Sequence, residues 1–93
     1  MAKIGKVFSP VKIKLKTVND ASLFTAKCNE YKEYDIDYLY NRFVIDGKSL
    51  MGILSTGLDK ECFVEIHCDN EKICKQFRKD MKLWIVEEQY DKC

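Results

Sequence analysis

The chain has 93 residues and a formal net charge of +1, from 16 basic and 15 acidic side chains. Its length suits a single domain, and 46% hydrophobic with 33% charged residues is a globular composition, not a disordered one. The near-neutral balance argues against a protein that binds nucleic acid by broad phosphate neutralisation. No apolar run approaches the length of a membrane span.

The amino terminus carries no recognisable export signal, and an odd number of cysteines, five, is typical of a reduced cytoplasmic protein. We interpret residues 1–10 as a leader, residues 11–87 as the domain and residues 88–93 as a polar tail. No cofactor is expected.

A metal site is not expected either. Cys62, Cys68 and Cys74 are each six residues apart, a spacing that matches no short metal-binding motif. His67 and Cys68 are neighbours on a predicted strand and therefore point to opposite faces, which prevents easy chelation of one ion. A structural or surface role is favoured for His67.

The first two elements follow from their periodicity. Residues 11–16 alternate apolar side chains with lysine, which predicts a half-buried strand. Apolar residues then recur every three to four positions, which predicts a helix near residues 20–32 with Asn19 or Asp20 as its N-cap.

A hairpin is predicted next. Residues 34–40 alternate and are rich in strand formers, and Asn41-Arg42 separates them from the strand at residues 43–45. The three tyrosines of the first strand suit either base stacking with nucleic acid or core and edge packing. We favour packing because aspartates flank them.

A short helix is predicted from Leu50 to Leu54, with Ser49 as its N-cap and Gly57 just past its end. Residues 61–68 then alternate as a fourth strand. A long last helix begins after Asp69 or Asn70. Its predicted apolar stripe comprises Ile73, Cys74, Phe77, Met81, Trp84 and Ile85.

The predicted order is strand, helix, strand, strand, short helix, strand, long helix. Because the strands alternate, one sheet face is covered by helices and the other faces water. The fold class is therefore α+β. We expect an open-faced sandwich, with a four-stranded antiparallel sheet covered on one face by three helices.

This element order, together with the run KSLMGILS from Lys48 to Ser55, resembles HPr, the phosphocarrier of the bacterial sugar phosphotransferase system. The resemblance covers residues 11–87 and implies the same open-faced sandwich. HPr proteins carry phosphate on a histidine at the start of the first helix, in a segment like Gly-Leu-His-Ala-Arg-Pro-Ala. The matching segment here, residues 17–22, has no histidine, arginine or proline, and its Asp20 would repel phosphate.

The resemblance also implies a second site at Ser49. In Gram-positive relatives the serine that opens the short helix is phosphorylated by HPr kinase/phosphorylase, and this switches binding to a transcriptional regulator. A phosphate there would be stabilised by free N–H groups and the helix dipole, with Lys48 as a nearby cation. The simpler interpretation is that Ser49 is only an N-cap.

The short helix of the family also offers an apolar patch to partner proteins. By resemblance, the partner-binding positions are Lys48, Met51 and Leu54. Of the helix residues, Met51 and Leu54 are expected to be exposed, while Leu50 and Ile53 point inward. The sequence thus favours a regulatory HPr-like protein that works through Ser49 and is not a histidine phosphocarrier. The alternative is a protein-binding module without phosphate chemistry. No nucleophile–base pair indicates an independent enzyme.

Overall fold

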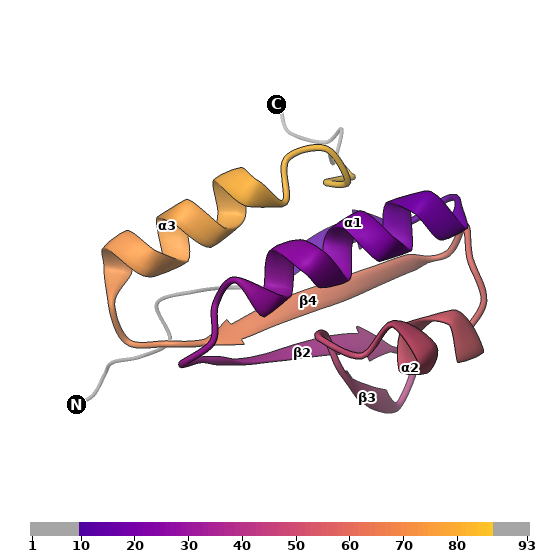
Figure 1. Ribbon diagram of the computed structural model, residues 1–93, viewed down its shortest axis with the longest axis horizontal. Helices are drawn as coiled ribbons and strands as arrows, with labels where there is room; N and C mark the ends of the chain where they lie inside the picture. The colour runs from indigo at the N-terminus through magenta and orange to yellow at the C-terminus, as the bar shows by residue number, and fades with distance from the viewer. Residues whose placement is uncertain (1–9, 87–93) are drawn as a thin grey trace, which may run out of the picture.

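The computed structural model describes residues 10–86 of the chain. The predicted tail and all but the last residue of the predicted leader lie outside this range. In chain order the elements are β1 (Val11–Lys14), α1 (Val18–Asn29), β2 (Asp35–Tyr40), β3 (Phe43–Asp46), α2 (Leu50–Ser55), β4 (Glu61–His67) and α3 (Glu71–Asp80) (Figure 1). This is the predicted order of strands and helices.

The four strands form one antiparallel sheet in the order β1-β4-β2-β3. Both α1 and α3 run along the same side of this sheet (Figure 1). The predicted α+β open-faced sandwich is therefore confirmed. No helix within residues 10–86 is long and apolar enough to cross a membrane.

Alternate residues of the strands build one side of the core. Those that face the helices and are buried are Val11 and Ile13 of β1, Ile36 and Tyr38 of β2, and Cys62, Val64 and Ile66 of β4. Phe24 of α1 is 0% exposed and meets the rings of Tyr38 and Trp84 edge-on, at centroid distances of 5.9 and 5.8 Å. Edge-to-face contacts of this kind add to the free energy of burial.

The tyrosines of β2 and the segment before it pack as predicted. Tyr38 is buried, while Tyr34 and Tyr40 are half-buried against the core. They therefore form no exposed stacking platform. The hairpin that follows turns at Asn41, whose φ of 54° is the left-handed conformation that asparagine tolerates without glycine.

The predicted N-cap of α1 was wrong by two to three residues. Thr17 is the N-cap, and Asp20 is the third residue of the helix and completes a capping box with it. A capping box needs a hydroxyl residue followed three positions later by a carboxylate or amide. Thr17 and Asp20 satisfy that spacing, which the sequence analysis overlooked.

The predicted extent of the last helix was also wrong. The helix ends at Asp80, and the chain turns so that Ile85 forms a bridge with Ile13. The amide of Lys14 donates to the Trp84 carbonyl and the amide of Val86 to the Lys12 carbonyl, both at 2.9 Å. The open edge of β1 supplies these hydrogen-bonding groups, which periodicity alone does not reveal.

The two faces of α2 differ sharply, which generates a stability prediction. Ile53 is 0% exposed, so we expect Ile53→Ala to lower the free energy of unfolding by about 2–5 kcal/mol through the lost burial and the cavity. Met51 is 78% exposed, so Met51→Ala on the same helix should change it by less than about 0.5 kcal/mol. Urea unfolding followed by Trp84 fluorescence measures both. Equal losses would contradict the packing of α2.

Candidate functional site

The start of α1 is closed by its own side chains. The Thr17 hydroxyl accepts a hydrogen bond from the Asp20 amide at 3.0 Å. In return the Asp20 carboxylate accepts from the amides of Lys16 and Thr17, at 3.1 and 3.2 Å. The Asp20 carboxylate thus lies at the positive end of the helix dipole, where an anion is favoured. A negative charge already holds this position, so it is poorly suited to a phosphate.

The only histidine of the chain, His67, lies at the end of β4, as the sequence predicted. It therefore belongs to a different element from the start of α1. No imidazole is present in the segment that leads into α1, because residues 15–20 read Leu-Lys-Thr-Val-Asn-Asp. Threonine has no ring nitrogen to accept and release a phosphoryl group.

The start of α2 is built differently. Ser49 is the N-cap, as predicted, and its hydroxyl accepts from the Gly52 amide at 3.1 Å. The Ser49 side of the helix packs closely on β3, because a side-chain carbon added at Gly52 would lie 2.8 Å from a methyl group of Ile45. Unlike α1, α2 has no acidic residue in its first turn. Ser49 itself is half-buried.

Lys48 is anchored by three hydrogen bonds. Its amide donates to the Asp46 carboxylate at 2.9 Å, and its carbonyl accepts from the Asn29 side chain at 3.4 Å. Its ammonium donates to the Tyr34 carbonyl at 2.8 Å. A phosphate on Ser49 would therefore compete with this carbonyl for the cation.

The proposed contact residues of α2 differ in exposure. Met51 is 78% exposed, whereas Leu54 is half-buried against the core. Ile53 is buried, and Leu50, predicted to point inward, is also half-buried. The Met51 side chain is thus accessible to a partner protein, whereas only part of the Leu54 side chain is.

The chain matches the family model described as "PTS HPr component phosphorylation site" over residues 11–79. It belongs to the HPr family. The match runs from the first residue of β1 to the penultimate residue of α3 and so spans the sheet and all three helices. No curated protein gives a match to the chain.

Members of the HPr family are phosphocarriers and not catalytic enzymes, and they act through other proteins of the phosphotransferase system. In this HPr family member Thr17 and Asp20 occupy the start of α1. The Ser49 hydroxyl lies at the start of α2. The two helix termini therefore differ in the chemistry that they allow.

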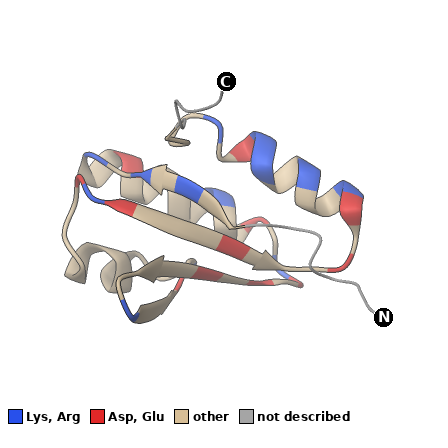
Figure 2. Ribbon diagram, turned by 180° about the vertical axis from the view of Figure 1, so that it is seen from behind, with Lys and Arg blue, Asp and Glu red and all other residues tan. Residues whose placement is uncertain are grey.

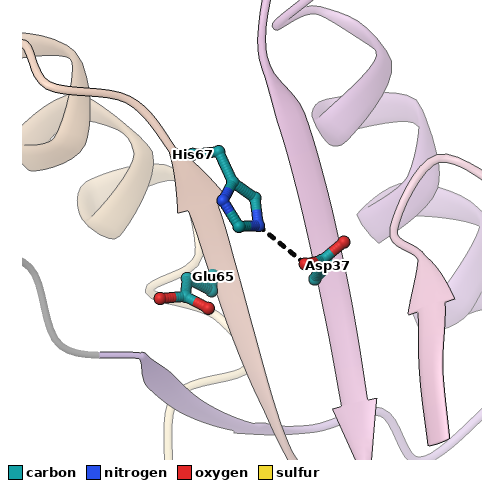
Figure 3. A group of neighbouring side chains, drawn as sticks. All are labelled: Asp37, Glu65 and His67. Atoms are coloured by element: carbon teal, nitrogen blue, oxygen red, sulfur yellow. Dashed lines mark hydrogen bonds and ion pairs between the residues drawn. The ribbon is translucent and has the colours of Figure 1, made fainter.

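A second group of polar side chains lies on the sheet face that the helices leave open. His67 of β4 bonds to Asp37 of β2, with 2.6 Å between the imidazole Nε2 and a carboxylate oxygen, and Glu65 lies beside them (Figure 3). Acidic residues lie along β2 and β4, whereas basic residues lie along β1 and α3 (Figure 2). A shallow depression of about 620 Å³ adjoins the group and is lined by Asp35, Ile36, Asp37, Val44, Asp46, Lys48 and His67.

Sequence reasoning missed this group. Alternation along residues 61–68 places Phe63, Glu65 and His67 on one face of β4, but no residue of β2 was predicted to lie beside them. The available signal was the alternation of β2, which places Asp35 and Asp37 on the open face. Only the register of the two strands shows that Asp37 lies opposite Glu65.

The hydrogen bond to Asp37 is the largest cause that raises the pKa of His67 above its ordinary value of 6.5. Burial opposes it, and the negative charges of Asp37, Glu65 and Asp35 raise the pKa further. We therefore expect an NMR titration of the His67 ring to give a pKa above 6.5. The Asp37→Asn variant should lower it, because the largest cause is removed.

The raised pKa of His67 also makes the free energy of unfolding depend on pH. Because the folded-state pKa of His67 is raised, the stabilisation from this pair is fully present below about pH 6.5 and is lost as the pH rises through the folded-state pKa. An unchanged His67 pKa in Asp37→Asn would contradict the assignment.

Proposed function

We propose that this chain is a regulatory member of the HPr family that is controlled at Ser49 and does not carry phosphate on histidine. The observation that supports it most is the contrast between two helix starts. Thr17 and Asp20 close the start of α1 with a carboxylate, while α2 begins with a serine hydroxyl and no acid in its first turn. The cytoplasm is the compartment proposed for it.

A phosphate on Ser49 suits the local electrostatics. Helix N-termini carry unsatisfied amides and the positive end of the helix dipole, which together favour an anion. The Gly52 amide already donates to the Ser49 hydroxyl at 3.1 Å, so a phosphoryl oxygen would meet a donor that is in place. At α1 the same added charge would meet the Asp20 carboxylate.

The surface next to Ser49 could let a partner protein sense the phosphate. Met51 is two residues away and 78% exposed, and its flexible thioether side chain suits an adaptable protein contact. A phosphate beside it adds about two negative charges and several acceptor oxygens to the same surface. By family analogy, we propose HPr kinase/phosphorylase as the modifying enzyme and a transcriptional regulator as the partner that reads the mark.

Incubation with HPr kinase/phosphorylase and ATP tests the proposal. We expect one phosphate per chain by intact mass, localised to Ser49 by peptide sequencing. Ser49→Ala should abolish it, while Ser55→Ala on the same helix, where the hydroxyl donates to the Gly52 carbonyl, should not. Failure of the unaltered chain to accept phosphate would refute the regulatory proposal.

A second arm of that experiment tests whether the chain accepts phosphate on histidine. Labelled phosphoenolpyruvate with enzyme I should leave this chain unlabelled, because the start of α1 has no imidazole. A histidine-carrying HPr in the same reaction provides the positive control. Acid-labile label on His67 would show that the chain is a phosphocarrier after all.

The exposure of Met51 also supports a second candidate, a protein-binding module on this fold without phosphate chemistry. In that case Met51→Asp should weaken binding to a partner recovered from the native host by about tenfold or more, because a charge would be buried in the interface. Ser49→Ala should leave it unchanged. Isothermal titration calorimetry with the purified partner measures both. Loss of binding on phosphorylation of Ser49 would instead favour the regulatory function.

A further inference from the structure

The open face of the sheet brings three potential metal ligands together from two strands. Asp37 of β2 is the direct antiparallel partner of Glu65 on β4. His67 lies two residues further along β4 and, because side chains alternate, on the same face as Glu65. Figure 3 shows the His67 ring directed at Asp37, with Glu65 beside them. The register of the two strands is needed to bring Asp37 beside Glu65 and His67.

The distances suit one ion. One ligand atom from each of Asp37, Glu65 and His67 lies within 4.8 Å of the other two. A zinc ion bound to nitrogen and oxygen ligands at about 2.0–2.2 Å separates its tetrahedral donors by about 3.3 Å. The 2.6 Å contact of His67 with Asp37 would therefore open slightly and the Glu65 carboxylate would move closer. All three side chains reach solvent, since Asp37 and Glu65 are half-buried and His67 is exposed, which leaves them room to rotate.

The negative charges beside Asp37 favour a bound cation. Its partner on one side is Glu65 of β4 and its partner on the other is Asp46 of β3, so three carboxylates lie abreast across the sheet. Like charges directly opposite each other destabilise a strand pair. Within residues 10–86, no lysine or arginine forms an ion pair with Asp37 or Glu65, and the Lys48 ammonium is held by the Tyr34 carbonyl.

We propose that Asp37, Glu65 and His67 bind one divalent transition-metal ion, of which zinc is the type. The imidazole nitrogen favours such an ion over magnesium or calcium, which prefer oxygen ligands throughout. Three protein ligands leave a fourth position for water. The ion neutralises the facing carboxylates and links β2 to β4 on the face that no helix covers.

The neighbouring thiol is not part of the site. Cys68 follows His67 in the chain but is half-buried, and its sulfur accepts a hydrogen bond from the Asn70 amide at 3.2 Å. Among the described residues the chain offers other thiols only at Cys28, Cys62 and Cys74, which are buried. Zinc bound through thiolates would therefore occupy a site other than the one formed by Asp37, Glu65 and His67.

Titration of the full chain, reduced and freed of metal, with zinc sulfate tests the proposal. His67 is the only histidine, so one set of imidazole NMR signals reports the site. We expect these signals to shift and to saturate at one equivalent of zinc. Asp37→Asn and Glu65→Gln should each weaken binding by at least about tenfold, as loss of a ligand costs no less than loss of its supporting contacts.

The matched control is Glu61→Gln. Glu61 lies on the same strand and the same face as Glu65, but it pairs with Lys12 at 3.4 Å and is outside the cluster. Its variant removes the same charge and should bind zinc like the unaltered chain. Equal weakening in both glutamate variants would show a general charge effect and overturn the site.

Cobalt(II) provides an independent readout. Ligation by nitrogen and oxygen gives only weak visible bands, whereas thiolate ligands give an intense near-ultraviolet band. We expect no thiolate band, and we expect His67→Gln to remove the visible spectrum. A thiolate band that persists in His67→Gln, or imidazole signals that do not move with zinc, would overturn the proposal.

Discussion

The antiparallel pairing of β2 with β4 is the constraint on which both faces of this molecule depend. It places Ile36 opposite Ile66 and Tyr38 opposite Val64, and these pairs face the helices. The residue between them, Asp37, lies opposite Glu65 on the other face. Because side chains alternate with a period of two, a slip of one residue would bury the carboxylates and expose the core. The packing of the core therefore fixes the polar cluster as well.

The three helix starts show how small differences in capping separate chemical roles. Asp20 lies in the first turn of α1 and Glu71 in the first turn of α3, whereas α2 has no acidic residue there. Every one of these helices has a side-chain N-cap, so capping alone does not distinguish them. What distinguishes α2 is that no carboxylate lies beside its N-cap in the first turn. An added phosphate would therefore face the least repulsion at Ser49.

The sequence was sufficient for the features that depend on periodicity or local chemistry. Alternation identified β2 and β4, and the Ser49 N-cap followed from residue type, as did the left-handed Gly57 with its φ of 93°. Helical periodicity misleads where a turn continues the apolar spacing of the helix before it. Trp84 continues the stripe of α3, yet it reaches the core from a segment that pairs with β1.

The polar cluster could not be predicted because it depends on strand register, which one strand does not encode. His67 was considered only with its chain neighbour Cys68, and that pair does point apart. Exposure on α2 was likewise only partly predictable. Ile53 and Met51 follow helical geometry, whereas the half-burial of Leu54 depends on how closely α2 lies on the sheet.

The turn between β3 and α2 connects the two regions for which we propose roles. Asp46 ends β3 as the partner of Asp37, and its carbonyl accepts the Ser49 amide at 2.9 Å. Its carboxylate holds the Lys48 amide, and Lys48 lines the depression beside His67. A negative charge added at Ser49 and a positive ion bound at Asp37 would therefore act on one continuous stretch of backbone.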